Sequence, residues 1–128
     1  MKLLVEWDNE EKVIIRMTFA GKWTWHDFYQ ANLEAVAMMK TVEHPVHFLV
    51  DFRQSQGIPG DSPFIHARNA ITAIPDNWDI MVVVTNNPLL EHLVKVFRIT
   101  FYRLGAKTFT VTSLDDGYEL IAQQDSLV

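Results

Sequence analysis

Two short apolar segments, 46–52 and 78–85, restrict this chain to few folds. Both are rich in β-branched and aromatic residues, a composition typical of strands that are buried on both faces of a sheet. After each segment a polar residue stands directly before a proline, at 62–63 and 87–88, which favours the start of a helix. Strands that alternate with helices in this way predict a mainly parallel sheet with right-handed crossovers.

The remaining segments extend this pattern. Residues 3–7 and 13–19 alternate apolar and polar side chains on either side of a polar turn, which predicts an antiparallel hairpin. A last, edge strand is expected over 108–112. Helices are predicted over four segments, 25–41, 63–74, 88–104 and 114–123. The sequence therefore predicts one α/β domain, 1–128, in which an N-terminal hairpin leads into a mainly parallel sheet of four or five strands with four helices.

Three residues at helix ends or inside helices have specific expected roles. Ser62 is placed to cap the 63–74 helix through its hydroxyl, and the loss of such a cap costs roughly 1 kcal/mol. Gly105 follows the 88–104 segment, at the position where a left-handed residue commonly ends a helix. Gly117 lies inside the last predicted helix and is expected to weaken it by up to about 1 kcal/mol.

The composition limits the classes of function. The 128 residues are 48% hydrophobic and include four Trp and eight Phe, which is enough for one packed core and unlike a disordered chain. The net charge of −5 and the absence of any basic run argue against a nucleic-acid partner. The chain has no cysteine, which excludes disulfides and thiol catalysis and fits a reducing compartment.

The apolar segments of the sequence are all short. The first residues, MKLLVEWDNEE, lack the apolar stretch of a secretory signal. The longest charge-free stretch, 80–90, is far shorter than the roughly 18–20 residues of a spanning helix. We therefore expect a cytoplasmic protein without a membrane span.

Polar groups gather after the first buried strand, near its carboxyl end, where open α/β sheets tend to form their sites. We expect this loop and helix start, 57–68, to dock a protein partner. The expected docking residues are Asp51, Gly57, Gly60, Asp61, Ile65, His66 and Asn69.

The order of elements, with a strand that ends in Asp, a loop and then Asp-Ser at a helix start, resembles the STAS domain of sulphate transporters and anti-sigma-factor antagonists. Asp61, Ser62 and the apolar Phe64 overlie the Asp-Ser-Ser-Gly or Asp-Thr-Ser-Gly motif and the apolar residue that follows it in that family. The second hydroxyl and the glycine have no match, because Pro63 follows Ser62. The chain is most similar to a divergent branch, whose fold is also compared with lipid-carrying CRAL-TRIO domains.

The resemblance implies a non-enzymatic regulatory module. In that family, a serine or threonine at this position is phosphorylated by a partner kinase, and the unmodified form docks on the partner. The implied partner is thus a protein, such as an anti-sigma-type kinase, and Ser62 is the candidate phosphorylation site.

A second hypothesis, a carrier or sensor of a small apolar ligand, rests on the surplus of aromatic residues. Aromatic side chains cluster between Trp23 and Tyr29, where the hairpin meets the first helix. Together with the wide apolar arc of the 88–104 helix they could line a pocket, for which the candidate residues are Trp25, Tyr29 and Asn32. An aromatic-rich core explains the same residues. Within the arc, Leu90, Val94 and Phe101 form an extra stripe that either packs on a neighbouring helix or forms a homodimer surface.

Catalytic and metal sites have weak support. Ser62, His66 and Asp51 supply the residue types of a nucleophile triad, but Phe64 replaces the second glycine of G-x-S-x-G. His44 and His47 are three residues apart, and Pro45 and the start of a strand would separate their side chains. No other pair of histidines or acids stands at ligand spacing, so we predict no enzyme activity, no metal and no cofactor.

Overall fold

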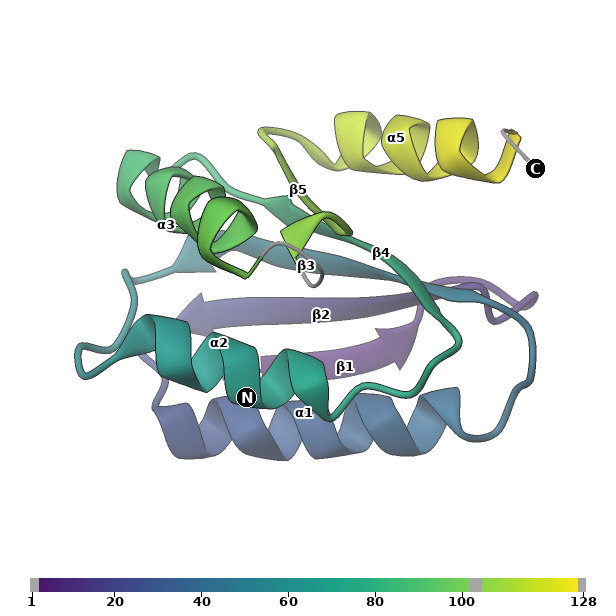
Figure 1. Cartoon of the computed structure of the whole chain (residues 1–128), viewed down its shortest axis with the longest axis horizontal. Helices are drawn as coiled ribbons and strands as arrows, with labels where there is room; N and C mark the ends of the chain where they lie inside the picture. Colours follow the sequence, from purple (N-terminus) through teal and green to yellow (C-terminus); the bar gives the residue numbers. More distant parts are fainter. Residues whose placement is uncertain (1–2, 102–104, 127–128) are drawn as a thin grey trace.

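The computed structural model describes residues 3–101 and 105–126 and contains a five-stranded sheet with the order β1-β2-β3-β4-β5 (Figure 1). β1 pairs antiparallel with β2, and every other neighbouring pair is parallel. The predicted hairpin and mainly parallel sheet are therefore confirmed. The strands are β1 (Leu3–Trp7), β2 (Ile14–Gly21), β3 (Val46–Ser55), β4 (Trp78–Val84) and β5 (Thr108–Val111).

Helices cover the two faces of the sheet unequally. α1, α2 and α3 each connect two neighbouring parallel strands. Because the strand order never reverses, right-handed crossovers place all three on one face. α5 covers the other face, and Figure 1 shows α1 and α2 below the strands and α5 above them. The helices are α1 (Trp25–Met39), α2 (Pro63–Thr72), α3 (Pro88–Thr100) and α5 (Leu114–Ser126).

The sheet separates two cores. Along β3, Phe48 and Val50 belong to the first core, under α1–α3, whereas Leu49 belongs to the second core, under α5. Both cores exclude water almost completely here, since Phe48 is 1% exposed and Leu49 is 0% exposed. The apolar run of β3 is thus buried on both faces, as its composition predicts.

Side chains cap the starts of α1, α3 and α5. At α1, Thr24 Oγ1 accepts a hydrogen bond from the Asp27 backbone N–H at 3.1 Å, and Asp27 Oδ2 accepts one from the Thr24 N–H at 2.9 Å. This is a complete capping box. At α3, the side chain of Asn87 accepts from the Leu89 N–H at 2.9 Å. At α5, Ser113 Oγ accepts a hydrogen bond from the Asp116 backbone N–H at 3.1 Å.

The predicted cap at α2 is wrong. Ser62 precedes Pro63 as expected, but its backbone is left-handed, with φ 60° and ψ 55°, and its side chain makes no capping hydrogen bond. A capping residue needs an extended backbone to bring its oxygen back onto the first N–H groups. The neighbouring Asp61 also has a positive φ of 72°, so two consecutive non-glycine residues hold a conformation that costs each of them about 1 kcal/mol or more.

The two glycines near the carboxyl end have steric roles. α3 ends at Thr100, and Gly105 lacks the positive φ expected of a left-handed helix end. A Cβ added to Gly105 would lie 2.3 Å from the Arg98 Cα atom, so backbone proximity requires glycine there. A Cβ on Gly117 would lie 2.9 Å from Leu49 Cδ1, which shows how closely α5 approaches the sheet.

The stripe expected to form a dimer surface points inward. Leu90 is 9% exposed, Val94 lines the cavity described below, and the Phe101 ring packs 4.9 Å from that of Phe97. The structure therefore favours the packing alternative for this stripe, with Val94 and Phe101 only partly buried; a homodimer through these residues stays a prediction. The apolar side chains that α3 does expose are Leu89 and Ile99.

Across residues 3–101 and 105–126, no helix combines the length and the apolar character needed to cross a membrane.

Candidate functional site

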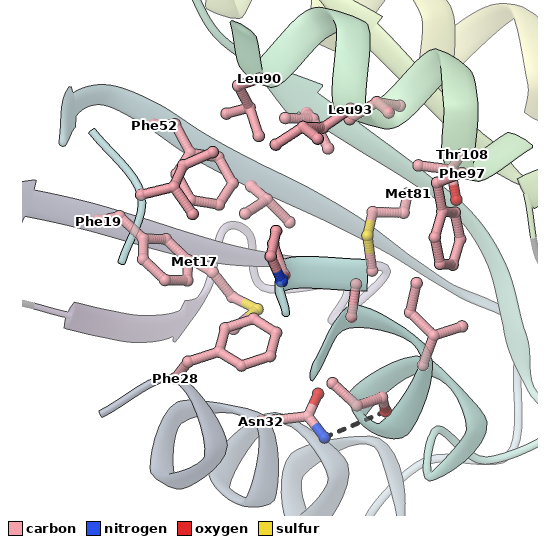
Figure 2. Close-up of a pocket in the computed structure, with 18 of the residues that line it drawn as sticks. Met17, Phe19, Phe28, Asn32, Phe52, Met81, Leu90, Leu93, Phe97 and Thr108 are labelled. Atoms are coloured by element: carbon pink, nitrogen blue, oxygen red, sulfur yellow. Dashed lines mark hydrogen bonds between the residues drawn. The ribbon is translucent and has the colours of Figure 1, made fainter. Parts of the chain in front are cut away.

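An apolar cavity of about 140 Å³ lies between the first face of the sheet and the helices α1, α2 and α3 (Figure 2). Its floor comes from β2, β3 and β4, and α3 forms one wall. Figure 2 shows Met17, Phe28, Met81 and Phe97 directed toward the same space from different elements. The cavity therefore lies between layers of the fold.

The sequence of α2 explains why space remains there. The α2 residues that line the cavity are Pro63, Phe64, Ala67, Ala70 and Ile71. Ala67 lies near the centre of this face at 100° per residue, and its side chain ends at Cβ. Two alanines on the face directed at the sheet leave a volume that larger side chains would fill.

The polar groups in the lining are few. Asn32 is 9% exposed and donates from Nδ2 to the Ala70 carbonyl at 3.2 Å, which links α1 to α2. Thr108, 3% exposed, lines the cavity from β5. Among the described residues, the lining includes no charged side chain. A charged ligand would therefore be buried without a partner, at high cost in free energy.

Aromatic side chains connect one end of the cavity to the 56–62 loop. The Phe19 ring stacks on that of Phe52 with centroids 4.4 Å apart, and Trp23 meets Phe19 edge-on at 4.8 Å. Trp23 Nε1 donates to Ser55 Oγ at 2.8 Å, and Trp25 Nε1 donates to the carbonyl of Gly60, also at 2.8 Å. These bonds hold the loop beside the cavity, where its residue Ile58 joins the lining.

Of the three residues predicted for a pocket, Trp25 and Asn32 line the cavity and Tyr29 does not. The Tyr29 hydroxyl lies 2.7 Å from His66 Nδ1 and accepts a hydrogen bond from Asn69 Nδ2 at 3.3 Å. The His66 ring also stacks on Trp25, with centroids 4.4 Å apart. These contacts join α1 to the outer side of α2.

The residues predicted to dock a partner are divided by the structure. Gly57, Gly60, Asp61 and Ile65 lie exposed along the loop and the start of α2, as does the candidate phosphorylation site at 62. The partly buried His66 is instead engaged by Tyr29 and Trp25, and Asn69, although exposed, donates to the Tyr29 hydroxyl.

Asp51 does not belong to this surface. It is 1% exposed and lies on the opposite face of the sheet, because along β3 it shares the orientation of Leu49. Arg53 donates to its carboxylate from Nε at 3.0 Å and from Nη2 at 2.9 Å, and Arg16 donates from Nη2 at 3.3 Å. Asp51 therefore cannot join Ser62 and His66 in a triad.

The two arginines decide the charge state of Asp51. Burial alone raises the pKa of this carboxyl. The hydrogen bonds from the Arg53 side chain and backbone, and the positive charges of Arg53 and Arg16, outweigh burial and hold the pKa below its ordinary value. In turn, the hydrogen bond to Asp51 raises the pKa of Arg53. Asp51, Arg16 and Arg53 therefore form a structural ion cluster on the face of the sheet that α5 covers.

The sequence analysis missed the floor of the cavity. Phe48, Val50, Met81 and Val83 were expected to be buried, but a continuous apolar run does not show which of its residues face which helix layer. A usable signal existed in β2, where alternation places Met17 and Phe19 on one face.

The site also differs in location from the expected one. In doubly wound sheets, ligands bind at the carboxyl ends of strands where the strand order reverses. Here the order is sequential from β1 to β5, so the sheet has no such crevice.

Neither the models of known protein families nor the curated proteins compared with this chain match it.

Proposed function

We propose that this protein is a non-enzymatic binding module that holds a small, neutral, apolar molecule in the cavity between its sheet and α1–α3. The observation that carries the proposal is the cavity itself, about 140 Å³ in volume and lined almost entirely by apolar side chains. An engineered apolar cavity of about 150 Å³ in another protein binds benzene or xenon. A ring of that size, or a short hydrocarbon segment, therefore matches the available volume.

The lining favours neutral ligands over charged ones. A fatty acid or another hydrophobic anion would need a cation or several N–H donors at its charged end. Besides the indole N–H groups of Trp23 and Trp25, which donate to Ser55 and Gly60, the polar side chains of the described lining are Asn32 and Thr108. These groups suit a hydroxyl, an ether or a carbonyl at most.

The four described methionines allow a direct test. Met17 and Met81 line the cavity, whereas Met38 and Met39 do not. Titration of methyl-¹³C-methionine-labelled protein with toluene should shift the methyl resonances of Met17 and Met81 and leave those of Met38 and Met39 in place. Benzoate, which has the same ring and a negative charge, should cause no such shift.

Native mass spectrometry of the freshly purified protein complements this test, because it detects a molecule that remains bound. Equal shifts of all four methionines, or none at saturating toluene, would contradict the proposal. Equal binding of benzoate and toluene would contradict the preference for neutral ligands.

A second candidate function rests on the 56–62 loop. Its residues Gly57, Asp61 and Ser62 have positive φ values, and Ile65 beyond it is 50% exposed. An exposed loop of this kind, together with the resemblance to STAS domains, supports docking of a protein partner and phosphorylation of Ser62. Phosphate mapping after incubation with an anti-sigma-type kinase tests this, with Ser62→Ala as the control. Modification elsewhere, or none, would refute this second function.

A further inference from the structure

A separate cluster of ligand-type side chains lies on the other side of the sheet, at the carboxyl end of α5. His47 of β3, Asp79 of β4 and Asp125 of α5 bring one imidazole and two carboxylates together, with ligand atoms within 4.8 Å of one another. Figure 1 shows this end of α5 above the side of the sheet where β3 and β4 begin. The cluster is thus far from the loop and on the opposite face from the cavity.

Hydrogen bonding determines the tautomer of His47. Its Nε2 lies 2.7 Å from Asp125 Oδ1, and a carboxylate can only accept. Nε2 therefore carries the proton. In the neutral ring, Nδ1 then presents a lone pair.

That lone pair has no hydrogen-bond partner within residues 3–101 and 105–126, although His47 is only 1% exposed. The nearest carboxylate oxygen of Asp79, Oδ2, lies 3.8 Å from Nδ1. This separation is too long for a hydrogen bond. Two electron-pair donors thus face each other across a gap beside a buried imidazole, which is an unfavourable arrangement unless a cation or a hydrogen-bond donor lies between them.

A divalent transition-metal ion has the size for this gap. Zn²⁺ binds imidazole nitrogen and carboxylate oxygen at about 2.0–2.2 Å. Two such bonds span up to roughly 4.2 Å, so one ion can contact both Nδ1 and Oδ2 at their present separation. A ligating histidine also commonly donates its other N–H to a carboxylate, which is the role that Asp125 fills here.

We propose that His47 Nδ1 and Asp79 bind a divalent transition-metal ion such as Zn²⁺, with Asp125 positioning the imidazole. Water completes the coordination. Gln124 Nε2, 3.4 Å from Asp79 Oδ1, helps to hold the carboxylate. The ion joins β3 to β4. Asp125 and Gln124 hydrogen-bond to its two ligands, so the bound ion also stabilises the contact of α5 with the sheet. Its nitrogen ligand favours Zn²⁺ over Mg²⁺ or Ca²⁺, which prefer all-oxygen sites.

Nuclear magnetic resonance of the imidazole nitrogens tests this directly in the full chain. At pH 8, after removal of metals by chelation, Zn²⁺ should move the Nδ1 resonance of His47 while Nε2 stays protonated. The exposed histidines His26, His44 and His92 serve as internal controls for adventitious binding. Mg²⁺ at the same concentration should leave His47 unchanged.

A matched pair of variants assigns the ligands. Asp79→Asn keeps the size of a side chain that is 29% exposed, and it should weaken Zn²⁺ binding at least 10-fold. Glu119→Gln removes the same charge from an exposed position on α5 outside the cluster and should leave the affinity unchanged. Zn²⁺ should raise the unfolding temperature of the wild type and of Glu119→Gln, and should have little effect on Asp79→Asn.

Two results would overturn the proposal. The first is a response to Zn²⁺ that is confined to the exposed histidines. The second is a His47 ring that carries protons on both nitrogens at pH 8 with and without Zn²⁺. Nδ1 would then hold a proton directed at Asp79 and would have no lone pair for a metal ion. Neither result bears on toluene binding, so the apolar cavity stands or falls separately.

Discussion

Replacing Ala67 with leucine should stabilise the protein and reduce its capacity for an apolar ligand. The cavity of about 140 Å³ leaves room for a larger side chain at this position. Leucine adds three carbons, each contributing about 0.8 kcal/mol when buried. Adjustment of neighbouring side chains will consume part of this gain, so we expect a net increase of about 1–2 kcal/mol in the free energy of unfolding.

Guanidinium unfolding, followed by tryptophan fluorescence, measures this change. The denaturation midpoint should rise while the slope stays the same. Ala37→Leu is the matched control, because Ala37 is an exposed residue of α1 and alanine and leucine have similar helix propensities. The control should change stability by no more than about 0.5 kcal/mol. In the toluene titration, Ala67→Leu should bind at least 10-fold more weakly than the wild type.

Two outcomes would refute this reasoning at different points. A loss of 1 kcal/mol or more in Ala67→Leu, at unchanged slope, would show that no space exists beneath α2. A gain in stability with undiminished toluene binding would place the ligand elsewhere and remove the support for the proposed function.

Three further predictions, which use five substitutions, test the local structure. Gly105→Ala should destabilise the protein by about 2 kcal/mol or more, because its Cβ would meet the backbone of Arg98. Gly117→Ala should stay within about 1 kcal/mol of the wild type in the same denaturation assay. There the gain in helix propensity opposes a close contact with the end of the Leu49 side chain. Ser62→Ala should leave the unfolding free energy unchanged within about 0.5 kcal/mol, while Thr24→Ala should lose about 1 kcal/mol with its capping box. The lowered pKa of Asp51 means that its stabilising contribution is present above its unfolded-state pKa of about 3.9 and is lost as the pH falls through the folded value. Unfolding measured from pH 6 to pH 3 should therefore show a shallower loss of stability for Asp51→Asn, and an equal slope would contradict the role of the ion pair.

Much of the fold could be predicted because its signals are local. Alternation in β2 and the continuous apolar runs of β3 and β4 indicated strand type and burial. Pro63 marked the first residue of α2 correctly. The capping role of Ser62 failed because it depends on the loop, which sets the backbone at 61 and 62 to left-handed values. The role predicted for Gly105 was wrong for a related reason, because only the folded chain brings the backbone of Arg98 against it.

The sites were predicted less completely because they are assembled from distant elements. Trp25 and Asn32 could be placed on the inner face of α1, but helical periodicity did not separate them from Tyr29, which lies on a neighbouring edge. His47 was judged by its spacing from His44, whereas its actual neighbours, Asp79 and Asp125, come from two later elements. Asp51 appeared to belong to the loop that follows it, although the pleat of β3 turns it to the far side of the sheet.

The sequential strand order has a consequence for biosynthesis. Each strand pairs with the strand made immediately before it, so the sheet can grow in the order in which the ribosome delivers it. The cavity takes its lining from residues 17–108, all of which precede α5. A nascent chain could thus form its ligand chamber while the second face of the sheet is still bare, and a ligand bound at that stage would assist folding before the last helix closes over Leu49.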